Sequence, residues 1–136
     1  MDVKQLNIKA VLIGFAVDFF GSMIAALVFG MVYGGLLASR GMGVAQITET
    51  MTHAPAVLAA SLVFGLLFTA LGGYLAARID GGGDAINPLA VGAVSTGLGV
   101  LTLLFTKEHG PLWYNAAAFV LTLPCALLGG WLHHRR

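Results

Sequence analysis

The sequence predicts an all-α integral membrane protein, a four-helix bundle with both termini in the cytoplasm. Three observations lead to this prediction. Apolar residues make up 58% of the chain and charged residues only 10%, whereas a soluble domain carries roughly a quarter charged residues. The apolar residues gather in four long runs. These runs contain a single charged side chain, Asp18, because every Lys and Arg lies outside them.

The four runs define the predicted spans within one domain, residues 1–136. They cover residues 11–38, 56–77, 89–105 and 112–132. A helix of about 20 residues crosses a bilayer, with a usual range of roughly 17 to 25. The third run is therefore short, and the first is long enough to tilt or to project into one interface. An Asp at mid-membrane costs about 2.5 to 3.5 kcal/mol, but the large apolar residues of the first run contribute roughly 4 to 8 kcal/mol, so this run inserts.

The distribution of Lys and Arg predicts the orientation of the chain. With the N-terminus in the cytoplasm, Arg40 and Lys107 lie outside and all other cationic residues lie inside. The inside residues are Lys4, Lys9, Arg78, Arg135 and Arg136. Because cytoplasmic flanks carry the excess of Lys and Arg, we expect a multi-pass protein of a bacterial inner membrane. Arg78, Arg135 and Arg136 are then placed to contact anionic lipid headgroups.

The segments between the runs are short, and the longest is residues 39–55. Its apolar residues recur at helical spacing: Val44, Ile47, Met51 and Ala54. This segment is either a short helix lying in the outer interface or an irregular loop. Asn87 and Pro88 predict the cap and the first residue of the third long helix, and Pro111 suits the first position of the fourth. The tight loop at residues 106–110 predicts that the last two helices are antiparallel neighbours.

Polar residues inside the runs predict a layer within the membrane. Counting 1.5 Å per helical residue from the cytoplasmic ends places five of them at a similar depth of roughly 10 to 15 Å. They are Asp18, Thr69, Ser95, Thr96 and Thr122, and Ser22 follows Asp18 by one turn. Intramembrane acids face protein or water and mark working positions. We expect Asp18 to be hydrogen-bonded in this layer, either as a proton or cation site or as a purely structural group.

Each run also carries small residues along one helix face, at steps of three and four residues. The glycines among them are Gly14, Gly21, Gly65, Gly72, Gly73, Gly92, Gly99 and Gly129. Lipid gives helices no hydrophobic reason to associate, so faces of small residues let backbones approach closely. The stripes predict a compact bundle or a tightly packed oligomer.

The second run ends in Gly72-Gly73-Tyr74-Leu75-Ala76-Ala77-Arg78, and a glycine-rich turn and a Gly/Ala-rich third run follow. The segment from about Gly65 to Gly99 resembles small bacterial four-span membrane proteins of uncharacterised function. The resemblance implies the four-span fold and brings no catalytic or ligand residues. The pattern GGxLxxR also ends the first and fourth runs. It indicates either an internal duplication or convergence on a glycine pair followed by a snorkelling Arg.

Several kinds of site are not predicted. A net charge of +1 without a basic patch argues against nucleic acid as a partner. The histidines lie outside the runs, so a haem between helices, or any other cofactor, is not expected. Asp80 and Asp84 could hold a divalent cation, but a solvated glycine turn fits better and we expect no metal site. Cys125 is expected to be a small buried apolar residue, and no catalytic set of residues is visible.

These observations predict a non-enzymatic membrane protein, a small packing or accessory subunit that self-associates or joins a larger membrane complex. Its short loops leave little protein outside the bilayer. Its expected partners are therefore membrane lipids and the helices of a homo-oligomer or larger complex. The alternative is a small transporter or channel subunit in which Asp18 binds a proton or a cation.

Overall fold

The computed structural model describes residues 6–81, 84–106 and 110–135, and every regular element in them is a helix. The helices are α1 (Ile8–Ser39), α2 (Val44–His53), α3 (Pro55–Asp80), α4 (Ile86–Phe105) and α5 (Leu112–His134). All of them except α2 are long and apolar enough to cross a membrane. This confirms the predicted all-α fold with four long apolar helices, which is the fold of a multi-pass membrane protein.

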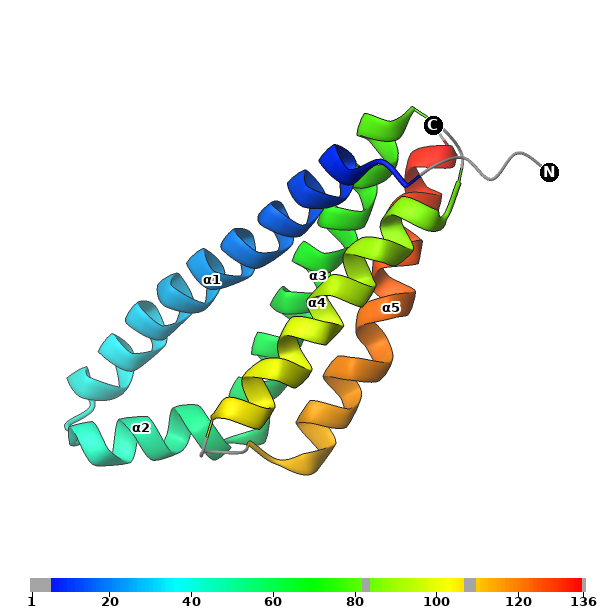
Figure 1. Ribbon diagram of the computed structural model, residues 1–136. Coiled ribbons are helices and arrows are strands. Elements are labelled where there is room, and N and C mark those ends of the chain that lie inside the picture. Colours follow the sequence, from blue (N-terminus) through cyan, green and yellow to red (C-terminus); the bar gives the residue numbers. More distant parts are fainter. Residues whose placement is uncertain (1–5, 82–83, 107–109, 136) are drawn as a thin grey trace.

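The two ends of the bundle differ in which helices meet there. At one end, which we call the terminal end, α1 and α4 begin and α3 and α5 finish (Figure 1). At the other end, the α2 end, α2 runs across from the last turn of α1 to the first turn of α3 (Figure 1). All four long helices run from one end to the other, so the chain crosses the bundle four times.

α1 is the longest of these helices, with 32 residues, or about 48 Å at 1.5 Å per residue. Asn7 caps it, because the side-chain oxygen accepts a hydrogen bond from the Ala10 amide at 3.2 Å, as N-cap residues do. The helix lies against its neighbours at the terminal end and diverges from them toward the α2 end (Figure 1). A tilt of this kind accommodates a hydrophobic helix that is longer than the bilayer core.

Residues 39–55 contain a helix, so of the two alternatives for this segment the helix is right. A turn at Gly41 separates α2 from α1, and its φ of 83° lies in the left-handed region that glycine adopts readily. Along α2 the hydroxyls of Thr48, Thr50 and Thr52 each donate to the carbonyl oxygen four residues earlier. The threonines therefore satisfy their hydroxyl donors within the helix.

α4 begins at Ile86 and is flanked by Ala85, so the prediction that Asn87 caps it and Pro88 starts it is wrong. Asn87 is fully buried, and its Oδ1 accepts a hydrogen bond from the Asn7 amide at 2.9 Å. A long-range bond to the start of α1 thus outweighs the local preference of Asn for the cap. Pro88 still lies in the first helical turn, where its missing N–H leaves no helical hydrogen bond unmade.

α4 and α5 are antiparallel neighbours, as the tight loop between them predicts (Figure 1). They approach closely at Gly92, where an added Cβ would lie 3.0 Å from the Ala126 Cβ. Pro111 is the residue before α5 and not its first residue, because the helix begins at Leu112. This difference of one residue is within the usual uncertainty of helix ends.

Backbones approach most closely at the terminal end. α3 meets α1 at Gly72 and Gly14, where a Cβ on Gly72 would lie 2.5 Å from the Gly14 carbonyl oxygen. α3 meets α5 at Gly73 and Gly129, where an added Cβ on either residue would overlap a backbone carbonyl of the facing helix. Only glycine fits at these positions, because any side chain would force the helices apart. The terminal end is therefore held by direct contact of helix backbones.

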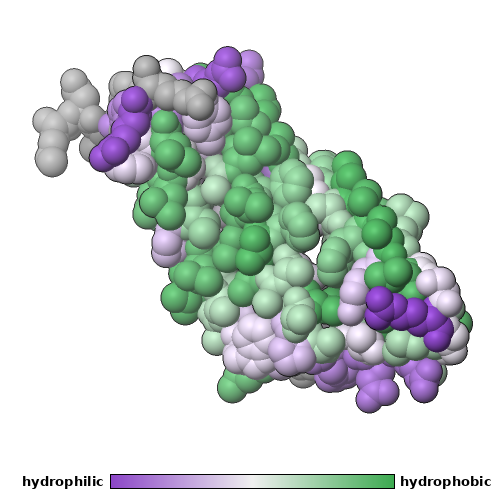
Figure 2. All heavy atoms as spheres, turned by 180° about the vertical axis from the view of Figure 1, so that it is seen from behind, coloured by the Kyte–Doolittle hydropathy of each residue, from purple (hydrophilic) through white to green (hydrophobic). Residues whose placement is uncertain are grey.

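Large apolar side chains cover the outside of the long helices. Figure 2 shows them over the middle of the molecule, with hydrophilic residues gathered toward the two ends. Exposed examples are Phe20, Leu27, Val32, Leu104 and Val120. Soluble monomers rarely expose contiguous apolar patches larger than a few hundred Å². An apolar girdle between polar ends suits contact with lipid chains.

Candidate functional site: the cavity beside Asp18

Asp18 lies on α1 near the point where this helix leaves α3, and only 6% of its surface is exposed. The Thr69 hydroxyl of α3 donates to Oδ1 at 2.9 Å, and the Ser95 hydroxyl of α4 donates to Oδ2. Three helices therefore meet at this carboxylate. Ser22, one turn further along α1, is a further side-chain hydrogen-bond partner of Asp18.

The cavity beside Asp18, which we call the Asp18 cavity, has a volume of about 810 Å³. It lies between α1 on one side and α3, α4 and α5 on the other, and Met51 and Thr52 of α2 line it at the α2 end. On α3 its lining runs from Thr69 to Leu58, which corresponds to about 16 Å along the helix. Asp18 thus lies at the inner end of an elongated cavity.

The structure brings five of the six predicted polar-layer residues to this cavity. Its lining includes Asp18, Ser22, Thr69, Ser95 and Thr122. The Thr122 hydroxyl donates to the Ala118 carbonyl oxygen at 2.6 Å, so it is satisfied within α5. Thr96 is not among the lining residues, and its buried hydroxyl oxygen has no hydrogen-bond partner within the part of the chain that the structure describes.

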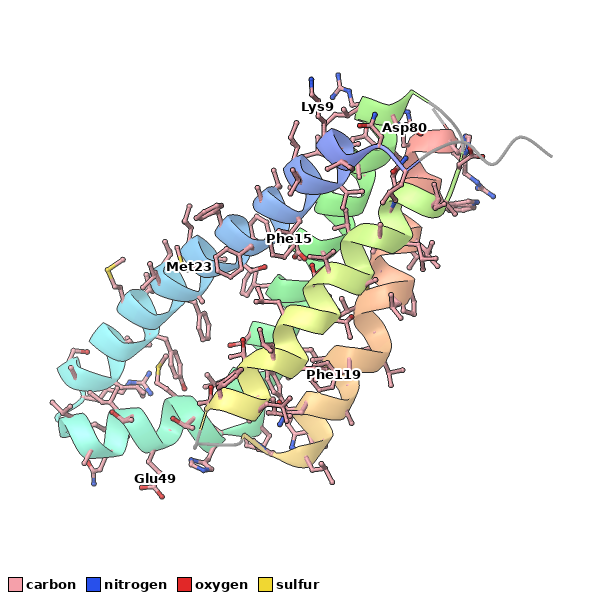
Figure 3. The ribbon with its side chains drawn as sticks, in the orientation of Figure 1. Lys9, Phe15, Met23, Glu49, Asp80 and Phe119 are labelled. Carbon is pink, nitrogen blue, oxygen red and sulfur yellow. The ribbon has the colours of Figure 1, made fainter. Side chains whose placement is uncertain are left out.

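The walls of the Asp18 cavity are mainly apolar and aromatic. Phe15 and Phe19 come from α1, on either side of Asp18 in the sequence, and Phe119 comes from α5. Figure 3 labels Phe15 and Phe119 on these two helices. Among the described residues that line the cavity, Asp18 is the one charged side chain, because none of the others is Lys, Arg, Glu or His. The described lining residues therefore supply one carboxylate, that of Asp18.

The cavity lies where α1 diverges from α3, and the change in their contact begins near Gly21 (Figure 1). The Phe68 ring lies directly against Gly21, so that an added Cβ there would overlap the ring. About two turns earlier on α1, Gly14 still meets the α3 backbone at Gly72. A large ring thus replaces a glycine as the surface that α1 packs against, and the two helices separate from this point onward.

The glycines predicted to pack helices fall into three groups. Gly14, Gly72, Gly73, Gly92 and Gly129 lie at close contacts between helices. Gly21 and Gly99 lie beneath aromatic rings, those of Phe68 and Phe119. A Cβ on Gly65 would meet no atom within 4 Å, and this residue lines the Asp18 cavity. Gly65 therefore leaves space open where the other glycines allow contact.

The arginines predicted to contact lipid headgroups lie at the terminal end. Arg78 and Arg135 are both exposed, and the Arg135 guanidinium lies 4.0 Å from the centre of the Trp131 ring. That geometry is a cation–π contact. Arg136 lies outside the described residues, as do Lys4 and Lys107.

Two other predicted features have specific positions in the structure. The Asp80 carboxylate accepts a hydrogen bond from the Asn7 side-chain amide at 3.4 Å, which links the end of α3 to the start of α1. Gly82 and Gly83, the middle of the possible cation loop, lie outside the described residues. Cys125 is half-buried on α5 and so is less enclosed than expected.

Sequence reasoning missed the cavity and its aromatic walls. The small-residue faces of the second and fourth runs do include Ser61 and Asn115, which lie eight residues before Thr69 and seven before Thr122. Both residues line the cavity. The divergence of α1 had no comparable signal, because it depends on the contact of Phe68 with Gly21 across two helices.

Comparisons of the chain with protein-family models, with curated proteins and with solved structures find no match. The chemistry of the Asp18 cavity follows from its own residues. A buried carboxylate can bind a proton or a cation, and the hydroxyls of Thr69 and Ser95 hold it in place. The apolar walls can enclose a ligand of moderate size, since ligand cavities typically measure 300 to 1,000 Å³.

Proposed function

We propose that this protein is a small transporter subunit that binds a cation at Asp18. The observation that carries the proposal is the position of a buried carboxylate at the inner end of an elongated cavity of about 810 Å³. An acid that served only to join helices would need no such space beside it. Acids within the membrane that face a cavity mark ion or substrate pathways.

The glycine contacts favour this function over that of a packing or accessory subunit. The accessory role was predicted from stripes of small residues that could meet another chain. Gly14, Gly72, Gly73 and Gly129 instead pack against helices of the same chain. These stripes are therefore largely used within one molecule and give little support to a separate partner.

We also propose that the protein lies in a bacterial inner membrane with the terminal end in the cytoplasm. Lys9, Arg78 and Arg135 lie near this end, whereas Arg40 lies at the other. Cytoplasmic flanks carry the excess of Lys and Arg. In this orientation the close-packed end of the bundle faces the cytoplasm, and the Asp18 cavity extends toward the outer side.

Flux into proteoliposomes tests the proposed function. The purified protein should pass protons or small cations down an imposed gradient. Asp18→Asn should lower the rate of this flux about tenfold or more, because the substitution removes the negative charge that binds the cation. Glu49→Gln is the matched control, since Glu49 is an exposed acid of α2 (Figure 3), and it should leave the rate unchanged. Equal rates in Asp18→Asn and the unmodified protein would contradict transport through this site.

A further inference from the structure

We propose that the Asp18 cavity binds an elongated organic monocation, with its ammonium group against Asp18 and an apolar body along the cavity. The inference rests on the proposed function and names its substrate class. It depends on three properties of the cavity: the donor atoms around Asp18, the charge of the lining, and the shape and polarity of the walls.

The donor atoms do not suit a divalent metal ion. Ca²⁺ takes six to eight oxygen ligands, and Mg²⁺ requires near-ideal octahedral geometry. Asp18 is the only carboxylate among the lining residues that the structure describes, and each of its oxygens already accepts a hydroxyl hydrogen bond. In the described ranges, no group of three or more His, Cys, Asp or Glu side chains could hold a metal. An organic ammonium group needs no set of ligand atoms and is attracted by the single negative charge that the carboxylate supplies.

The charge of the lining selects a ligand with one positive charge and no negative one. Asp18 supplies a single negative charge, and the lining holds no Lys, Arg or His among the described residues. A zwitterion such as an amino acid would place its carboxylate in a low-dielectric cavity, without a cationic partner among the described residues. Burying an unpaired charge costs far more than a hydrogen bond returns. A simple organic monocation avoids this cost.

The walls suit an apolar body longer than a bare ion. The lining extends about 16 Å from Thr69 to Leu58 by the helical rise, whereas a metal ion or proton would leave nearly all of the volume empty. Phe15 and Phe19 flank Asp18 on α1, and an ammonium group over an aromatic face gains cation–π attraction. Further along, Phe119 and Leu62 offer apolar contacts to a chain.

Binding to the whole protein in lipid nanodiscs tests the ligand class, with empty nanodiscs subtracted. Three probes of matched chain length distinguish the possibilities in isothermal titration calorimetry: hexyltrimethylammonium, its zwitterionic 6-carboxylate analogue, and hexanol. We expect one hexyltrimethylammonium per chain, and binding of the other two weaker by about tenfold or more. Equal binding of the cation and the zwitterion, or no saturable binding of the cation, would overturn the proposal.

Two variants connect this binding to the cavity. Asp18→Asn should weaken binding of hexyltrimethylammonium about tenfold or more, because the attraction between the cation and the carboxylate charge is lost. If that variant does not fold, Gly65→Leu gives an independent test, since the new side chain enters the cavity without a clash at its Cβ. It should block the cation by volume. Gly97→Leu is the matched control, because Gly97 also has open space but does not line the cavity.

The binding and flux results separate the two proposals. Suppose that hexyltrimethylammonium binds saturably, that Asp18→Asn and Gly65→Leu both weaken this binding, and that no flux is seen. That result would support the ligand class and contradict transport. Flux of protons or Na⁺ that needs Asp18, without binding of hexyltrimethylammonium, would support transport and overturn the ligand class. Cation binding that persists unchanged in Gly65→Leu would place the ligand elsewhere and overturn the assignment to this cavity.

Discussion

The two ends of the bundle use glycine in opposite ways. At the terminal end, Gly72, Gly73 and Gly129 lie where any Cβ would strike a backbone carbonyl of the facing helix. Toward the α2 end, a Cβ on Gly65 would meet no atom within 4 Å. Gly65 and Gly72 lie two turns apart on α3, at a spacing that puts them on the same helix face. The same residue type thus closes one end of the molecule and leaves the other open.

The difference shows that a stripe of small residues has no single structural meaning. Gly72 faces α1 where α1 is in contact, and Gly65 faces the space that α1 has left. Asp18 lies between the two regions, with hydroxyl partners on α3 and α4 and the cavity beside it. The close packing at the terminal end positions the carboxylate, and the cavity that extends toward the α2 end lies beside it.

The largest expected change in the free energy of unfolding comes from adding a methyl group at the terminal end. Gly129→Ala should destabilise the fold by about 3 kcal/mol, because the new Cβ overlaps the Ala70 carbonyl group and overpacking typically costs 1 to 3 kcal/mol. Gly65→Ala is the matched change at the open end, and it should be neutral or stabilise by about 0.5 kcal/mol, since Ala is the better helix former. Unfolding by SDS in mixed micelles measures both. Equal losses would remove the distinction between the two ends.

A smaller effect is expected where the two regions meet. Ser95→Ala removes a hydroxyl donor to Asp18 and should destabilise the fold by about 1 kcal/mol. Thr102→Val is a suitable control, because the Thr102 hydroxyl donates to the Leu98 carbonyl of its own helix at 2.8 Å and not to Asp18. The same micelle titration compares them. A loss in Thr102→Val as large as that in Ser95→Ala would mean that the bond to Asp18 adds nothing specific.

The fold class could be predicted because a membrane span depends on local composition and length. The four long apolar helices follow directly from the four runs. The first residue of α4 could not be predicted, because Asn87 accepts a hydrogen bond from Asn7, eighty residues earlier, instead of capping its own helix. Local preference therefore predicted the element but not the contact that positions its first turn.

The polar layer was predictable in depth but not in direction. Ser95 and Thr96 are adjacent and lie at nearly the same depth, yet Ser95 bonds to Asp18 and Thr96 does not line the cavity. Neighbouring helical residues point about 100° apart, so depth alone cannot tell which one faces a given helix. The cavity itself depends on how far α1 leans away from α3, and the Phe68 ring lies between these helices at Gly21.

Accessibility of single cysteines in nanodiscs tests most directly whether the space beside Asp18 is open. The native Cys125 is first replaced by Ala, and Ser61 and Thr96 are then changed to Cys one at a time. Ser61 lines the cavity and Thr96 does not. We expect the cationic reagent methanethiosulfonate ethylammonium to modify Ser61→Cys quickly, much faster than its anionic sulfonate analogue, and to modify Thr96→Cys slowly. Slow modification of both cysteines, or no preference for the cationic reagent at Ser61→Cys, would contradict an open cavity governed by the Asp18 carboxylate.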